Sequence, residues 1–215
     1  MDNTENRLKD CAIVACGTLS LELNYLQQSG RLGVGKLLYT KPGRHEVPRE
    51  LESQLIKQIG TAKAYASNIV VVYGGKFCYI NADHPYRKID TIIQEQQGPG
   101  IRITRLKATH CVDMLASAED RERIAQGKDV YWLTPGWMKY RHQVYQGWDK
   151  GLANENFPKH SGGAIVLDAL GYFDRVMADN PEEILEFSDW MGIPIEPYRV
   201  TLDRFQGLLL DEVTP

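Results

Sequence analysis

The chain has 215 residues, of which 43% are hydrophobic and 25% are charged, and its formal net charge at pH 7 is -3. A chain of this length can bury a hydrophobic core without disulfides or a structural metal, so any bound metal would serve chemistry. The charge shows no basic excess, which argues against nucleic acid as a partner.

The first six residues are polar and acidic, and the apolar run that follows them, 11–16, is too short for a signal peptide. We find no run of about 18 apolar residues that would suggest a membrane span. We therefore expect a soluble cytoplasmic protein without a membrane partner. In that compartment thiols stay reduced, so the four cysteines are interpreted as thiols or ligands before disulfides.

Short apolar runs alternate with amphipathic stretches of helical period, a pattern typical of βαβ units. We expect strands at 12–16, 36–40, 68–73, 101–106, 129–133, 172–177 and 195–200. We expect helices at 18–30, from 48, at 109–115, from 135, and at 163–170, 180–192 and 202–210. The sequence thus predicts the α/β class, with a single doubly wound, mostly parallel sheet and helices on both faces. One domain would span 1–215, with flexible ends at 1–10 and 211–215.

Three of the four cysteines follow predicted strands. Cys16 ends the first strand, Cys78 comes just past the third, and Cys111 comes past the fourth at a helix start. Because ligands of an open parallel sheet bind outside the carboxyl ends of its strands, we expect these three thiols at one edge. Cys11 precedes the first strand, about 16 Å away along it, and is expected to be structural or incidental.

Three thiolates from separate loops suit a metal centre. They can hold a 4Fe-4S cluster with one iron open, or zinc with His110 or His160 as a further ligand. A thiolate at a helix N-terminus has a lowered pKa, so Cys16 and Cys111 are expected to be reactive near neutral pH. A catalytic thiol without metal and plain buried cysteines remain open, since the sequence has no Cys-x-x-Cys pair.

Other residues accompany the cysteines at this predicted edge. We expect four of them to form a cofactor pocket: Gly17, Thr134, Gly136 and Trp137. The two histidines are candidates for a catalytic role, His110 beside Cys111, and His160 before a glycine pair that would cradle an anion at a helix start. The aromatic residues near the fifth strand are expected chiefly to pack the core, namely Trp132, Trp137, Tyr140, Tyr145 and Trp148.

Several short motifs stand out together: Ala15-Cys16-Gly17, Tyr73-Gly74 followed by Cys78, His110-Cys111 followed by Leu115, and Leu133-Thr134-Pro135-Gly136-Trp137. In combination they resemble the domain of unknown function 1638 family. The resemblance runs from about Cys11 to Leu210. Gly75-Lys76-Phe77 stand between the Tyr-Gly pair and Cys78, whereas the family has its second cysteine sooner. The resemblance implies bacterial and methanogenic relatives near corrinoid-dependent methyltransferase systems, and so a role in one-carbon or cofactor metabolism.

Three functions follow as hypotheses. The first is an iron-sulfur protein with three cysteine ligands and an open site, used for substrate binding, sulfur handling or electron delivery. The second is a zinc-dependent methyl or alkyl transfer enzyme. The third is a non-catalytic accessory protein that docks on a methyltransferase or corrinoid carrier. Whether the protein is an enzyme is left open, and its partner would be a small-molecule substrate or such a protein.

Overall fold

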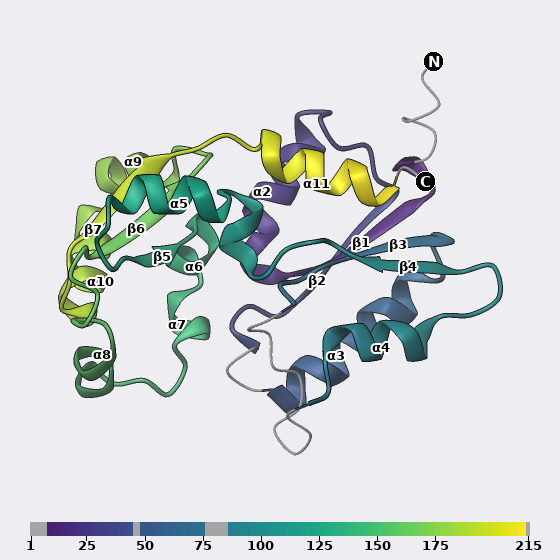
Figure 1. Cartoon of the computed structure of the whole chain (residues 1–215), viewed down its shortest axis with the longest axis horizontal. Coiled ribbons are helices and arrows are strands. Elements are labelled where there is room, and N and C mark those ends of the chain that lie inside the picture. Colours follow the sequence, from purple (N-terminus) through teal and green to yellow (C-terminus); the bar gives the residue numbers. More distant parts are fainter. Residues whose placement is uncertain (1–7, 45–47, 76–85, 214–215) are drawn as a thin grey trace.

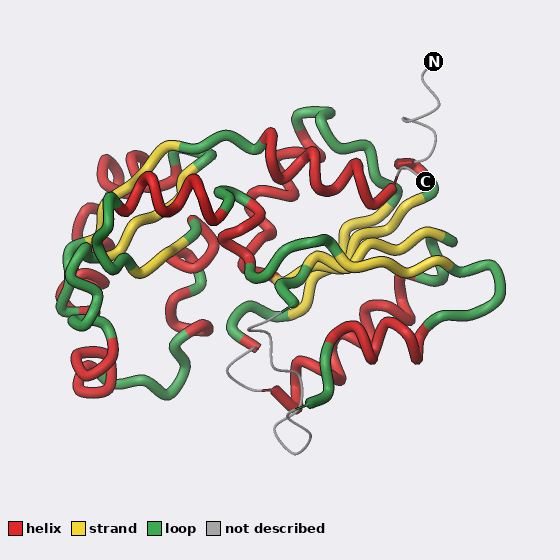
Figure 2. Tube along the Cα trace, viewed as in Figure 1, coloured by secondary structure: helices red, strands yellow, loops and turns green. Residues whose placement is uncertain are grey.

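A computed structural model describes residues 8–44, 48–75 and 86–213. The strands form two separate parallel sheets (Figures 1 and 2). The first has the order β2-β1-β3-β4 and the second β5-β6-β7. The α/β class with parallel strands is confirmed. The expected single sheet is wrong, because no pairing joins β4 to β5 in the described part of the chain.

The first sheet is built from four short strands. They are β1 (Cys11–Cys16), β2 (Lys36–Thr40), β3 (Asn68–Val72) and β4 (Arg102–Arg105). Helices α2 (Ser20–Gln28) and α11 (Asp203–Val213) cover one face, and α3 (Pro48–Ala62) and α4 (Ile89–Gln96) cover the other (Figure 1). Charged Arg102 and Arg105 at both ends of β4 suit an edge strand, which explains why the sheet stops there.

Apolar side chains on both faces of β1 explain how this sheet is buried on both sides. Ile13 and Ala15 belong to the core beneath α2 and α11, together with Leu23 and Phe205. Ala12 and Val14 belong to the core on the side of α3 and α4. Since successive side chains of a strand point to opposite faces, one apolar strand serves both cores.

The second sheet consists of β5 (Tyr131–Leu133), β6 (Ala164–Asp168) and β7 (Ile195–Arg199). Around it lie α6 (Pro135–Lys139), α7 (Arg141–Val144), α8 (Lys150–Asn156), α9 (Tyr172–Asp179) and α10 (Pro181–Met191). A third core, rich in aromatic residues, fills this region, and it contains Trp137, Tyr140, Tyr145 and Trp148 of the aromatic set. The chain passes between the sheets through two short helices, η3 (Cys111–Met114) and α5 (Ala118–Ala125).

Two elements are predicted with the wrong type, one as a helix and one as a strand. The segment 163–170 was expected to be helical but contains β6, and 172–177 was expected to be a strand but lies in α9. Asp168 accounts for the boundary, because its carboxylate accepts the amides of Leu170 at 2.9 Å and Phe173 at 2.8 Å and so starts α9.

Both ends of the described chain pack on the first sheet or its core. Leu8 is only 6% exposed and belongs to the first core, and α11 continues past residue 210 to Val213. Within the described residues, no helix has the length and apolar character needed to cross a membrane.

Candidate functional site

The strand order of the first sheet reverses its winding between β1 and β3. From β1 the chain crosses through α2 to β2 on one side, and through α3 it reaches β3 on the other side. Such a reversal of winding opens a crevice in which doubly wound proteins bind ligands. Cys16 ends β1, and β3 ends six residues before Cys78.

Cys16 lies among hydroxyl groups at this edge of the sheet. Its sulfur is 3.1 Å from the Thr18 hydroxyl, and the Tyr73 hydroxyl is within hydrogen-bonding reach. Tyr73 in turn bonds to the Thr40 hydroxyl. Burial raises the pKa of the Cys16 thiol, against the smaller lowering by these hydroxyls. The expected low pKa of Cys16 is therefore wrong.

The turn that carries Cys111 is pressed against the end of β3. A Cβ atom at Gly74 would lie 2.4 Å from the Cα of His110 and 2.6 Å from the carbonyl oxygen of Thr109. The Gly75 amide also donates to the Ala108 carbonyl at 3.0 Å. Only glycine permits this approach of two backbones. Cys111 is thus held next to the segment that leads to Cys78, although Cys78 itself lies outside the described residues.

Asp113 fixes the turn at Cys111. Its Oδ2 accepts the backbone amides of Thr109 at 2.9 Å and His110 at 3.1 Å. Its Oδ1 lies 2.5 Å from the Arg121 guanidinium and 3.1 Å from His110 Nδ1. Sequence reasoning missed both Asp113 and Arg121. The spacing of three residues from His110 to Asp113 is a capping signal that could have revealed the first, whereas nothing local marks Arg121.

The expected cofactor-pocket residues lie where the two sheets meet. A Cβ at Gly136 would fall 1.7 Å from the Thr18 carbonyl oxygen, and one at Gly17 would fall 2.6 Å from the Thr40 carbonyl oxygen. Thr134 is fully buried and caps α6 by accepting the Trp137 amide at 3.4 Å. These residues therefore adjoin the Cys16 turn. Their contacts in the structure are with protein, and their role toward a cofactor stays a prediction.

His160 lies at the other end of its sheet. Its Nδ1 is 3.1 Å from Asp129, which precedes β5, and residues 161–163 lead into β6. This is the amino end of these strands, whereas Thr134 marks the carboxyl end that meets Thr18. The expected helix after the glycine pair is a strand, so the anion cradle proposed at a helix start is wrong. His110 is the histidine that accompanies the cysteines.

A buried carboxyl group close to the Cys16 turn was not anticipated. Glu22 is fully buried on α2, and neither of its oxygens has a hydrogen-bond partner within the described structure. Burial, together with the charge of nearby Asp168, raises the pKa of Glu22 to about 8. Its position on the apolar face of α2, between Leu19 and Leu26, is the signal that could have identified it.

Cys11 lies at the opposite end of β1 from Cys16, as expected, and is fully buried in the first core. Burial raises the pKa of its thiol to about 11. Within the described residues, no three His, Cys, Asp or Glu side chains come together as a metal-binding group. The three-cysteine centre includes Cys78, so it stays a prediction.

The comparison with protein families agrees with the resemblance in the sequence. The family model described as a protein of unknown function (DUF1638) matches residues 39–209. The chain belongs to this family. The matched part contains Cys78 and Cys111, whereas Cys16 lies before it. We found no match among curated proteins or among solved structures.

Proposed function

We propose that this DUF1638 protein binds a metal centre in the crevice at the carboxyl edge of the first sheet. The ligands would be Cys16, Cys78 and Cys111, and the centre would be a 4Fe-4S cluster with one iron open to substrate. A role of this centre in one-carbon, corrinoid or sulfur-related metabolism of the cytoplasm is part of the same proposal, and it rests on the family resemblance.

One observation carries this proposal. The consecutive residues Tyr73 and Gly74 contact both cysteine-bearing turns, because the Tyr73 hydroxyl reaches Cys16 while the Gly74 backbone touches His110. The chain then leads from this point of contact toward Cys78. The polar surroundings of Cys16 also fit a metal ligand, since a bound cation displaces the proton of a coordinating thiol even where burial alone would retain it.

A second candidate is a zinc centre for methyl or alkyl transfer, with His110 and two cysteines as ligands. The position of the ring favours it, because His110 Nδ1 is held within the turn, 3.1 Å from Asp113 Oδ1 and 3.2 Å from Arg121 Nη1, which leaves Nε2 as the nitrogen that could bind zinc. Zinc would activate a substrate thiolate in such an enzyme. The third candidate is the accessory protein, in which the cysteines only line a pocket at a docking site.

The deciding experiment is analysis of iron, sulfide and zinc, with a visible spectrum, on anaerobically purified full-length protein. For a cluster we expect about four irons per chain and a broad absorption band, both lost in Cys16→Ala and Cys111→Ala. Cys11→Ala is the matched control, since it removes a thiol from the other end of the same strand and is expected to retain the metal.

The other outcomes separate the candidates. One zinc per chain without visible absorption, lost in His110→Ala as well as in Cys111→Ala, would replace the cluster by the zinc centre. Metal-free, colourless protein would exclude both and leave the accessory role. That role predicts that the cysteine variants still form a complex with a methyltransferase or corrinoid carrier.

A further inference from the structure

A cavity of about 740 Å³ lies next to the Cys111 turn, between the end of β4, the start of α5 and α11. Four cationic side chains line it, Arg105, Lys107, Arg121 and Arg204, and they come from separate parts of the chain. The side chain of His110 lines it as well. The cavity thus shares His110 with the candidate centre but has a composition of its own.

The arginines of this cavity are held in place by the protein. Arg105 is paired with Asp90 at 2.7 Å and donates to the carbonyls of Leu106 and Ala108 at 3.0 and 3.2 Å. Arg121 is paired with Asp113. The Arg204 Nε donates to the Asp113 carbonyl at 2.7 Å. Such anchoring fixes guanidinium groups before a ligand arrives, which lowers the entropic cost of binding.

Positive charge in this cavity exceeds negative charge. The lining contains two carboxylates, Asp113 and Glu119, and four cations, and with Asp90, which is paired with Arg105, three carboxylates stand against the four cations. The Lys107 side chain is exposed, and it has no ion-pair partner in the part of the chain that the structure describes. This local excess of positive charge contrasts with the net charge of -3 of the whole chain. A concave, locally basic site on an acidic protein favours a small anion over a polyanionic macromolecule.

We propose that this cavity binds the phosphate groups of a small molecule. Arg204 binds the Asp113 carbonyl through Nε alone, so its terminal nitrogens and the Lys107 ammonium can donate to phosphate oxygens, while the anchored Arg105 and Arg121 add positive charge. The cavity volume lies within the range of small-molecule sites. This inference goes beyond the proposed metal centre and does not depend on it, since none of the four cations is a proposed metal ligand.

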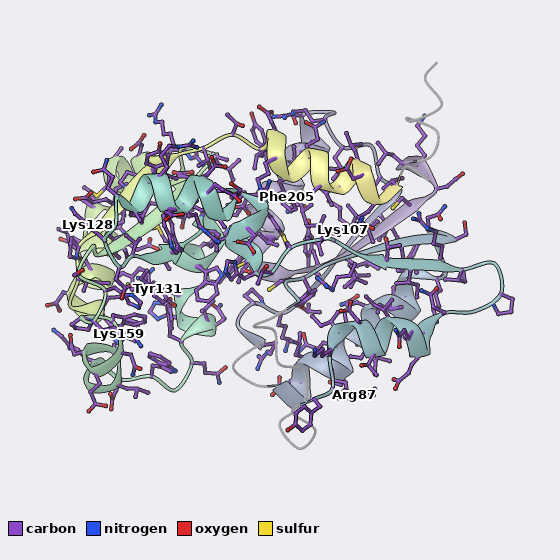
Figure 3. All side chains as sticks on the ribbon, viewed as in Figure 1. Arg87, Lys107, Lys128, Tyr131, Lys159 and Phe205 are labelled. Atoms are coloured by element: carbon purple, nitrogen blue, oxygen red, sulfur yellow. The ribbon has the colours of Figure 1, made fainter. Side chains whose placement is uncertain are left out.

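The test is isothermal titration calorimetry of the full-length protein with inorganic pyrophosphate. Citrate, a carboxylate of similar charge, serves as the comparison ligand. We expect one pyrophosphate per chain, bound more tightly than citrate and more weakly as salt is added. Lys107→Ala and Arg204→Ala should each weaken binding by about tenfold, since each removes one charge-assisted contact. Lys128→Ala is the matched control, because Lys128 is also exposed but lies far from Lys107, at the end of the second sheet (Figure 3).

Several results would overturn the inference. The inference is wrong if the wild-type protein does not bind pyrophosphate, or if Lys107→Ala binds it with the affinity of the wild type. It is also wrong if the wild type binds citrate at least as tightly as pyrophosphate. Binding of a single-stranded RNA oligonucleotide in place of pyrophosphate would also exclude the small molecule. Cys111→Ala should lose metal yet retain pyrophosphate binding, whereas Lys107→Ala should retain metal, so the two proposals fail separately.

Discussion

The two sheets of this protein use their residues in different ways. The first sheet brings glycines, thiols and hydroxyl groups to its carboxyl edge, where Gly74 and Gly17 let backbones approach closely. The second sheet is surrounded by aromatic rings, and Tyr145 and Phe157 lie at the centre of this aromatic cluster. Close backbone packing positions small reactive groups, whereas large rings bury area. Under the proposed function, the first region carries the chemistry and the rings of the second stabilise the fold.

The aromatic region also contains a cavity of about 430 Å³ between α7 and α10. Tyr145, Trp148 and Trp190 contribute to its walls, and the two tryptophans each contact Phe157, at 5.6 and 5.7 Å between ring centroids. The same rings that line this cavity belong to the third core. Their first role is therefore packing, as the sequence predicted for Tyr145 and Trp148.

The largest effect is expected from truncating the centre of the aromatic region. Phe157 is 2% exposed and contacts four aromatic residues, so Phe157→Ala should lower the free energy of unfolding by about 3–5 kcal/mol. Urea denaturation measures this loss. At low temperature, where the variant is folded, its metal content should equal that of the wild type. A loss of metal without a loss of stability would contradict the division between the two regions.

A second substitution disrupts the backbone contact between the two regions, at Gly136. Gly136→Ala places a methyl group against the Thr18 carbonyl oxygen, and it should destabilise the protein by about 3 kcal/mol because two backbones must separate. Gly207→Ala is the matched control. A Cβ at Gly207 meets nothing within 4 Å and lies within α11, so this variant should be more stable by about 0.5–1 kcal/mol. Equal stability of the two variants would show that the regions do not pack as described.

The buried carboxyl group of Glu22 should make the stability of the first region depend on pH. Its pKa is about 8 in the folded protein, against 4.5 for the ordinary group, so the folded state holds a proton that the unfolded chain releases. Its contribution to stability is complete below pH 4.5 and is lost as the pH rises toward 8. Glu22→Gln should remove this loss, which amounts to about 4 kcal/mol at pH 8.

Denaturation across this pH range measures the effect. Exposed Glu155 on α8 provides the control, because Glu155→Gln should leave the slope of stability against pH unchanged. If Glu22→Gln had the same slope as the wild type, the carboxyl group would be hydrated or paired in solution.

The smallest effect is expected at the Cys111 turn. Asp113→Asn keeps the shape of the side chain but removes its charge from Arg121 and from two backbone amides, which should cost about 1–2 kcal/mol. The same variant should bind metal more weakly, because the turn is less rigidly held. Metal content that is unchanged while stability falls would mean that Asp113 supports the fold alone.

Much of the first sheet could be predicted from the sequence. Its strands have clear boundaries, such as Gly17 after β1, and the rule for parallel sheets placed Cys16 and the Cys111 turn at one edge. In the second sheet the segment around β6 is a short apolar run, which periodicity alone cannot assign to strand or helix. The capping role of Asp168 would have resolved it, but that role depends on a turn at Gly171 with a positive φ of 65°.

The candidate site was predictable only in part, for a physical reason. Cys16 and Cys111 became candidates because each follows a strand that the sequence pattern predicts. The surroundings of these residues depend on contacts between distant segments, such as Arg121 with Asp113 and Arg204 with the Asp113 carbonyl. No local pattern encodes such contacts. The separation into two sheets was missed for the same reason, because each β-strand was recognised without its partner.

The contact of Gly136 with Thr18 has a mechanical consequence. No side chain stands between these two backbones, so there is no soft layer that could absorb a sliding movement at this point. Thr18 also carries the hydroxyl that lies beside the Cys16 sulfur. A displacement of α6 at Gly136 therefore acts directly on the Thr18 backbone, and through it on the hydroxyl beside the thiol.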